Sequence, residues 1–179
     1  MARASTEFAM HWRPWRTDMA QTDAIECVAF RIGWEGPLSR FFSDLKARGD
    51  DAYFHPHAGD EESLCSIARN AGHDLYYLFV RGDDVLAYGL LRGWDEGYEV
   101  PSLGIAVHPS MRGSGLGRLM MEYLEAMARL RGAQSMRLRL HKDNTVARDM
   151  YSRRGYRMEQ DDTDGNLLVG IKSLRGGVA

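Results

Sequence analysis

Apolar residues between positions 75 and 107 fall into three short runs separated by turn residues, which predicts three β-strands. The first two runs, 75–80 and 85–91, are joined by a Gly/Asp turn at 82–84 and should form an antiparallel hairpin. The third run, 102–107, ends at His108-Pro109, because proline cannot donate a hydrogen bond to a neighbouring strand. The middle of the chain therefore predicts a small antiparallel sheet.

The apolar spacing changes after Gly115 and becomes that of an amphipathic helix. The periodic positions continue to Gly132, a residue type that commonly ends helices, and they are Leu116, Leu119, Met120, Tyr123, Leu124, Met127, Ala128 and Leu130. Alternation then returns at 136–140, where three apolar residues alternate with polar ones, as in a half-buried strand. A helix followed by a strand is the prediction for this part.

The remaining elements follow from the same patterns. A further helix should begin at Asn144 or Thr145 and run to Arg154, followed by closing strands at 156–160 and 167–171. Helical spacing also appears near the N-terminus, at 37–48 and 61–71, whereas 53–57 is too short and broken for an element. Without repeats or a linker, this order indicates one mixed α/β domain.

Composition excludes several classes of protein. The chain has 179 residues with 23 Lys and Arg against 25 Asp and Glu, so it lacks the excess positive charge that drives nucleic-acid binding. No run approaches the roughly 18 apolar residues that a membrane span needs. The cysteines, Cys27 and Cys65, fit buried thiols in a reducing compartment, so we expect a cytoplasmic protein. Residues 1–9 contain a Glu7-Phe8 pair typical of a cloning linker and are set aside.

The segment with the most evident chemistry is the glycine-rich stretch 112–117, which directly joins the strand at 102–107 to the long helix. Backbone amides and the positive end of a helix dipole would meet there, which favours an anion. Arg112 adds a charge suited to phosphate oxygens. A Rossmann loop is excluded because the full G-x-G-x-x-G is missing, and a Walker loop because no Gly-Lys-Ser/Thr follows. A glycine-rich turn without a ligand is the alternative.

Two blocks of the sequence resemble motifs of the GNAT superfamily of acetyl-CoA-dependent N-acetyltransferases. The first, Arg112-x-x-Gly115-x-Gly117 after a strand, is similar to the family's R/Q-x-x-G-x-G/A motif. The second is Asn144-x-x-Ala147-x-x-x-Tyr151-x-x-x-Gly155-Tyr156. The resemblance covers about residues 76–171. It implies that residues 10–179 form a single α/β (α+β) domain, in which helices flank a mixed, mostly antiparallel central sheet with a splayed parallel strand pair.

The resemblance also implies a site for acetyl-CoA. Its pyrophosphate would be held by the amides of Arg112, Gly113, Ser114, Gly115, Leu116 and Gly117. Its pantetheine arm would bind Asn144 and the strand edge formed by Ile105, Ala106 and Val107. Tyr151 would lie near the thioester sulfur, where a hydroxyl can protonate the departing thiolate. A core aromatic residue with a satisfied hydroxyl is the alternative role for Tyr151.

The sequence gives a weaker signal for the general base, the group that would take a proton from the amine. Many family members carry a glutamate early in the strand before the glycine loop, where this chain has Pro101 or Ser102. Glu99 is the nearest carboxylate and could act through a water, while His57 has a suitable side chain for a base. Both have a structural alternative, a solvated charge for Glu99 and a hydrogen-bonded loop histidine for His57. The candidate acceptor-binding residues are His55, Trp94, Asp95 and Glu96.

The predicted function is direct transfer of an acetyl group from acetyl-CoA to a primary amine of a small polar acceptor, with an amino sugar favoured. Protein or peptide, polyamine and aminoglycoside amines stay open as acceptors. A non-catalytic acyl-CoA-binding or sensing domain is the alternative from another class, and the missing glutamate motivates it. No metal is expected, because His55, His57 and His73 show no ligand spacing. Neither nucleic acid nor a membrane is an expected partner, and a homodimer is left open.

Overall fold

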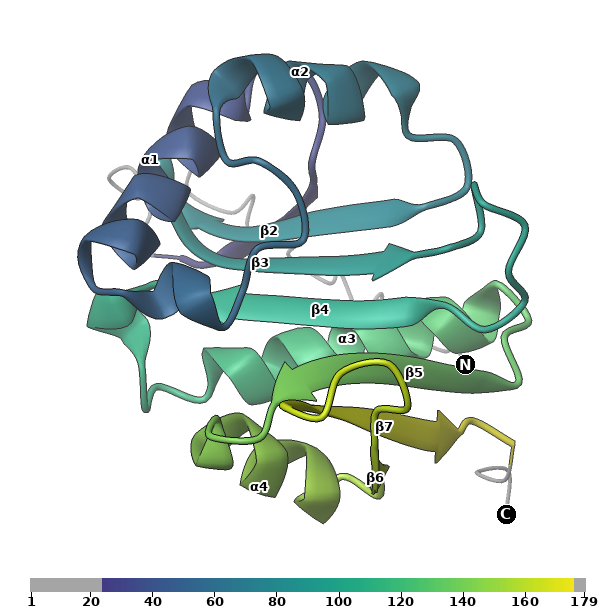
Figure 1. Cartoon of the computed structure of the whole chain (residues 1–179). Coiled ribbons are helices and arrows are strands. Elements are labelled where there is room, and N and C mark those ends of the chain that lie inside the picture. Colours follow the sequence, from purple (N-terminus) through teal and green to yellow (C-terminus); the bar gives the residue numbers. More distant parts are fainter. Residues whose placement is uncertain (1–23, 176–179) are drawn as a thin grey trace, which may run out of the picture.

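The computed structural model of the chain describes residues 24–175, which form one seven-stranded sheet with helices on both faces (Figure 1). The strand order is β1-β2-β3-β4-β5-β7-β6, and all neighbours are antiparallel except β4 and β5. The predicted fold class is confirmed. The strands are β1 (Glu26–Ala29), β2 (Leu75–Arg81), β3 (Asp84–Arg92), β4 (Ser102–Val107), β5 (Ser135–His141), β6 (Arg157–Gln160) and β7 (Leu167–Ser173).

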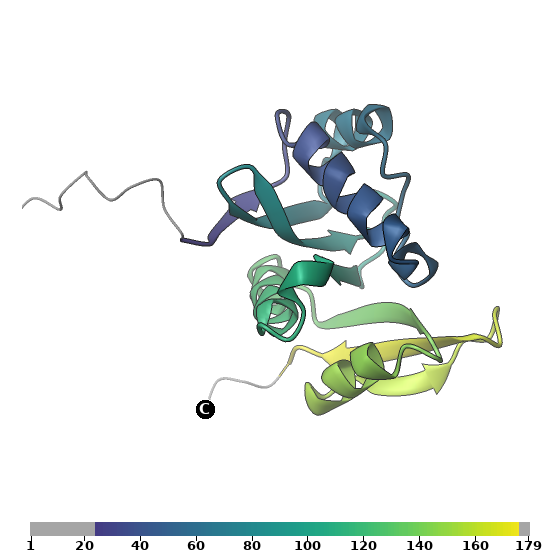
Figure 2. The ribbon, with the colours of Figure 1, turned by 90° about the vertical axis from the view of Figure 1, so that its left-hand side faces the viewer.

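The helices divide into two pairs, one on each face of the sheet (Figure 2). On one face, α1 (Glu35–Ala47) and α2 (Glu61–Asn70) pack Leu38, Phe41 and Leu64 against Tyr88 and neighbouring strand residues. On the other face lie α3 (Leu116–Leu130) and α4 (Thr145–Arg153). The second core contains, among others, Leu91, Leu103, Met120, Leu124, Leu138 and Tyr151. Two faces of one sheet therefore carry two separate apolar clusters.

The sheet is interrupted between β4 and β5. These parallel strands are bridged at a single position, Ser102 with Arg137, where the Arg137 N–H donates to the Pro101 carbonyl at 3.0 Å. By contrast, β4 pairs with β3 along its whole length, from Ser102 to Val107. The part of β4 beyond Ser102 therefore has an edge that faces away from β3 and is not bridged to β5 in the described structure.

Three short elements differ from the sequence-based prediction. β1 has only four residues and pairs with the outer side of β2, which gives too few positions for a recognisable pattern. The 3₁₀ helices η1 (Asp50–Ala52) and η2 (Pro109–Met111) consist of single turns, and such turns have no apolar periodicity. The segment 1–9 interpreted as a linker lies outside the described residues.

Candidate functional site

A cavity of about 660 Å³ lies beside the splayed end of β4. Four parts of the chain form its wall: the segment around η1, the end of β4, the glycine-rich loop with the start of α3, and the start of α4. The described residues that line it are Leu45, Asp50, Tyr53, Phe54, Ile105, Ala106, Val107, Met111, Arg112, Gly113, Gly115, Leu116, Gly117, Arg118, Asp143, Asn144, Thr145, Val146, Ala147, Met150 and Tyr151. Most of the residues predicted to bind the cofactor thus meet at one cavity, and Ser114 does not line it.

The first turn of α3 supplies this cavity with hydrogen-bond donors. Gly115 is the N-cap, with φ of 89°, and no side chain caps the helix. The first amides of a helix have no acceptor within it, so those of Leu116 and Gly117 are available to a ligand. Gly113 also has positive φ, 75°, a conformation that side chains other than glycine rarely adopt. A Cβ at Gly117 would lie 3.3 Å from Val107, so glycine lets α3 approach β4 closely.

Arg112 lines the same cavity, and its side chain already forms an ion pair. Its Nη2 donates to Oδ2 of Asp50 at 2.5 Å, and both residues line the cavity. The arginine side chain is 52% exposed, so water screens the pair and the guanidinium can turn to another anion. Ser114 instead donates from Oγ to the Met111 carbonyl at 2.5 Å, which fixes the shape of the loop. The glycines, free amides and arginine fit a pyrophosphate.

The start of α4 also lines this cavity, but one of its first amides is already bound by the side chain of the helix's own N-cap. Asn144 is its N-cap, and Oδ1 accepts the Ala147 N–H at 3.1 Å. About two turns after Asn144, Tyr151 lines the cavity although only 6% of its surface is exposed. Burial raises the pKa of the Tyr151 hydroxyl well above its ordinary value, so the hydroxyl keeps its proton at neutral pH. A protonated phenol on the cavity wall can donate a proton to a leaving group.

Comparison with known proteins agrees with this geometry. The family model described as Acetyltransferase (GNAT) family matches residues 38–156. The chain belongs to the GNAT acetyltransferase family. The predicted membership of this family of acetyl-CoA-dependent enzymes is therefore confirmed.

Solved structures share the GNAT fold at low sequence identity. PaiA N-acetyltransferase from Thermoplasma acidophilum, in complex with coenzyme A, is 15% identical, with a TM-score of 0.70 over 84% of this chain and 99% of that one. YncA from Salmonella typhimurium, with its cofactor acetyl-CoA, is 16% identical, with a TM-score of 0.65 over 87% and 97%. RimL, a ribosomal L7/L12 alpha-N-protein acetyltransferase in complex with coenzyme A, is 13% identical, with a TM-score of 0.68 over 86% and 96%.

The histidines predicted near this GNAT site do not line the cavity. Nδ1 of His57 lies 2.8 Å from the Ala58 carbonyl, which can only accept, so this nitrogen carries the proton. Nε2 then accepts the hydroxyl of Tyr88 at 2.8 Å. Burial lowers the pKa of His57, which keeps the ring neutral. With both nitrogens engaged, His57 acts as a packing residue of the α1 and α2 side, and His55 is exposed outside the cavity.

The loop after β3 does not contribute to the cavity either. Asp95 accepts the amides of Gly72, His73 and Asp74 at 3.1, 2.5 and 3.3 Å, so its carboxylate fastens this loop to the segment before β2. Trp94 packs against the α3 side, with the Arg131 guanidinium 5.7 Å from its ring centroid. Glu96 and Glu99 are exposed. Trp94, Asp95 and Glu96, predicted to bind the acceptor, therefore do not line the cavity.

Several cavity residues were missed as site candidates, among them Asp50, Tyr53 and Phe54. They follow α1 and cross the open end of the sheet, where the Tyr53 ring lies 5.8 Å from that of His141 at the end of β5. The ring of Phe54 lies over β4, since a Cβ at Gly104 would be 3.3 Å from it. The aromatic pair in an otherwise polar connection was the available sequence signal.

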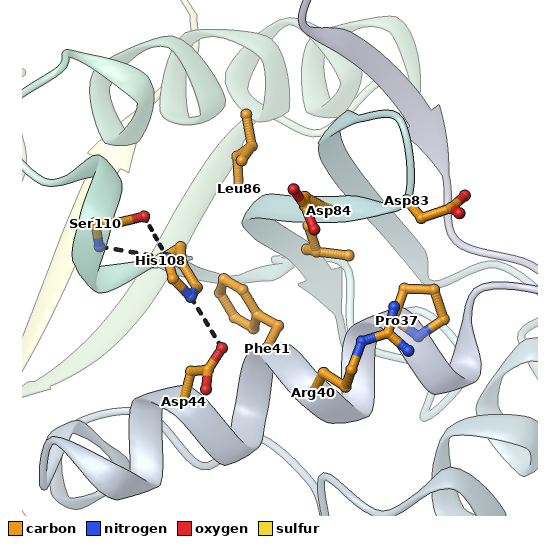
Figure 3. A pocket seen from close by; sticks show the side chains of 10 residues that line it. Pro37, Arg40, Phe41, Asp44, Asp83, Asp84, Leu86, His108 and Ser110 are labelled. Atoms are coloured by element: carbon orange, nitrogen blue, oxygen red, sulfur yellow. Dashed lines mark hydrogen bonds and ion pairs between the residues drawn. The ribbon is translucent and has the colours of Figure 1, made fainter.

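A second cavity, of about 230 Å³, lies between α1 and the turn joining β2 to β3 (Figure 3). His108 lies at its edge, with Nε2 3.1 Å from Asp44 and Nδ1 2.7 Å from the Ser110 hydroxyl (Figure 3). Nδ1 also accepts the Ser110 amide at 3.3 Å, so His108 caps η2. This cluster joins α1 to the segment that leads into the glycine loop.

Two structural observations bear on other classes of site. Within residues 24–175, no helix combines the length and apolar character that crossing a membrane requires. In the same part of the chain, His, Cys, Asp and Glu side chains do not gather in groups of three or more that could hold a metal ion.

Proposed function

We propose that this GNAT protein transfers an acetyl group from acetyl-CoA directly to a primary amine of a small polar acceptor. The observation that carries the proposal is the cavity at which the uncapped α3, the unbridged part of β4 and the Tyr151 hydroxyl meet. Donors for a pyrophosphate, a free strand edge for an amide-containing arm and a proton donor are together what acetyl transfer from coenzyme A requires. Three proteins of similar structure, solved with coenzyme A or acetyl-CoA, support the same ligand.

The reaction assigns distinct tasks to the two helices. The amides of α3 hold the cofactor phosphates, while Ile105, Ala106 and Val107 align the pantetheine arm. The neutral amine attacks the thioester carbon, and the carbon–sulfur bond breaks with its electron pair on sulfur. Tyr151 donates its proton to that thiolate, and the proton that the nitrogen loses as the amide forms returns to the Tyr151 phenolate. Cys27 and Cys65 lie outside the cavity wall, so no acyl-cysteine intermediate is proposed.

Deprotonation of the acceptor ammonium falls to Glu99 in this proposal. Glu99 is exposed ahead of β4 and makes no ion pair with another described residue, so a water can link it to an amine. His57 is a weaker candidate because both its nitrogens are engaged. Replacing Glu99 by Gln should lower kcat/KM below pH 8, where most acceptor is protonated, and have less effect at higher pH.

The deciding experiment is release of coenzyme A thiol from acetyl-CoA across a panel of amines. The panel holds amino sugars, polyamines, aminoglycosides and N-terminal peptides, the last because RimL is an alpha-N-protein acetyltransferase of similar structure. Turnover with any amine supports the enzyme. Tight coenzyme A binding without turnover would favour the sensing domain. Propionyl- and succinyl-CoA, run in parallel, test whether acetyl is the preferred acyl group.

A further inference from the structure

Three polar residues form a row across the sheet at the point where β4 and β5 separate. Register pairs Ser102 of β4 with Arg92 of β3 on one side and with Arg137 of β5 on the other. Directly paired residues project from the same face of a sheet. Strands lie about 4.8 Å apart, so the two arginines leave the sheet about 10 Å apart, with a serine hydroxyl between them. Two guanidinium groups and one hydroxyl are therefore directed to one face.

That face is the one on which α1 and α2 pack. Leu91 and Leu103 belong to the α3 core, so their neighbours Arg92 and Ser102 project to the opposite side. On the same face, β4 continues from Ser102 with Gly104, which Leu90 and Phe54 cover, and with Ala106, which is buried in the α1 and α2 core. Phe54 lies over Gly104 and lines the cofactor cavity, as does Ala106. The row thus stands on the strand that borders the cavity, four positions or about 13 Å along β4 from Ala106.

Neither arginine has its charge neutralised. No carboxylate within residues 24–175 forms an ion pair with Arg92 or Arg137. Arg92 is half-buried, and its Nη1 donates to a neutral acceptor, the Pro56 carbonyl, at 2.6 Å. Arg137 is exposed. The carboxylate of Asp74 is occupied, because one of its oxygens accepts the amides of Gly93, Trp94 and Asp95.

We infer that Arg92, Ser102 and Arg137 bind an anionic group, a carboxylate or a phosphate, carried by the amine acceptor. The inference rests on the proposed acetyl transfer and specifies its substrate class. Guanidinium groups bind carboxylate and phosphate oxygens in forked pairs, and a hydroxyl can donate a further bond to the same anion. An amine that also carries a carboxylate or phosphate, rather than a polycation, is the acceptor class that this row of groups favours.

Matched acceptor pairs test the inference. Glucosamine 6-phosphate is compared with glucosamine, and 4-aminobutyrate with 4-aminobutanamide, so that each pair differs in one anionic group and the two arms separate phosphate from carboxylate. We expect kcat/KM to be about 10- to 100-fold higher for the anionic member of at least one pair, the range of one or two charge-assisted hydrogen bonds. A kcat/KM for the anionic member that is equal to or below that of the neutral member in both pairs would overturn the inferred anion site.

Arginine variants test whether the preference for anionic acceptors arises at this row of residues. Arg137→Gln should reduce the ratio about tenfold through the acceptor KM, with the acetyl-CoA KM unchanged. Arg157→Gln is the matched control, because Arg157 is exposed in the same row, beyond Ile171 of β7, and lacks the adjacent serine. It should leave the ratio unchanged. An equal loss in both variants, or none in Arg137→Gln, contradicts the assigned site.

A binding measurement separates this inference from the proposed function. With coenzyme A present, inorganic phosphate and acetate are titrated while the Nε–Hε signals of Arg92 and Arg137 are followed by NMR. A saturable shift that is lost in Arg137→Gln supports the anion site even if no amine is acetylated, in which case only the proposed function fails. Turnover without anion preference and without a saturable shift refutes the anion site alone.

Discussion

Two helices, α3 and α4, begin at the same cavity, and they differ in whether a side chain caps the first turn. The first turn of α4 is closed by its own sequence, because Asn144 accepts the Ala147 amide. The first turn of α3 begins at Gly115, which has no side chain to offer. Both N-termini carry the positive end of a helix dipole, but a side chain occupies one of the first amides of α4 and none of those of α3. For this reason we place the phosphates of the proposed cofactor at the uncapped helix rather than at the capped one.

We therefore expect the two helices to have different functions. In the proposed reaction, α3 contributes backbone amides to cofactor binding, while α4 contributes the side chain of Tyr151 to proton transfer. Changes at the start of α3 should therefore alter cofactor affinity, and changes in α4 should alter rate or stability.

The largest expected effect comes from giving α3 the cap that α4 has. In Gly115→Asp the new carboxylate would accept the first amides of α3 and repel phosphate, so the Kd for coenzyme A should rise about 100-fold, measured by calorimetry. Gly132→Asp is the control, since Gly132 has a similar φ of 83° at the other end of α3, away from the cavity. It should cost stability without changing affinity. Equal affinity losses would mean that backbone strain explains the result.

Tyr151→Phe should affect rate instead of binding. Loss of a general acid lowers kcat by about 100-fold, and the Kd for coenzyme A should stay within about twofold of the wild-type value. Because burial raises the pKa of Tyr151, this group should cause no loss of wild-type kcat up to pH 9. Steady-state kinetics over pH 6–9 measure both points. Unchanged turnover in the variant would remove Tyr151 from the acid role.

Arg112→Gln should raise the Kd for coenzyme A about tenfold, the value of one charge-assisted contact. The salt dependence of binding should decrease in parallel, because one positive charge facing the phosphates is lost. Binding titrations at two ionic strengths measure both effects. Affinity that stays at the wild-type value would show that the backbone amides of α3 suffice.

Asn144→Ala removes the side-chain cap of α4 and should lower the free energy of unfolding by about 1 kcal/mol. Chemical denaturation measures this loss. Coenzyme A affinity should fall less than in Arg112→Gln, since no phosphate donor is removed. A larger loss of affinity than of stability would show that Asn144 binds the cofactor directly, as the family resemblance implies.

The smallest effect is expected at Asp50, which competes with phosphate for Arg112. Asp50→Asn releases the guanidinium and should tighten coenzyme A binding about two- to fivefold, consistent with the modest strength of exposed ion pairs. The double variant with Arg112→Gln should show no such gain. Weaker binding in Asp50→Asn would instead mean that Asp50 orients Arg112 productively.

The parts predicted well from sequence are those whose information is local. The run from 102 to 130 contains a strand, a glycine loop and an amphipathic helix in succession, and the structure has them at β4 and α3. Contacts between distant segments were not predictable. His57 accepts its hydrogen bond from Tyr88, 31 positions away, and Asp95 fastens a loop 21 to 23 positions away.

The row at Arg92, Ser102 and Arg137 illustrates the same limit. Its members belong to three strands, and a shift of one residue in either register would turn a partner to the opposite face. The acceptor contacts predicted from the sequence were His55, Trp94, Asp95 and Glu96, and the two adjacent acids are conspicuous in the chain. Only the pairing of β3, β4 and β5 brings the basic residues together.

The single bridge between β4 and β5 also has a consequence for folding stability. The strands β1 to β4 and the strands β5 to β7 share one backbone bridge, so their cohesion depends on the apolar packing beneath α3. An extended ligand that pairs with the free edge of β4 would act as an additional strand and join the two halves. Cofactor binding should therefore slow hydrogen exchange throughout β4 and β5, and raise the melting temperature of the whole domain.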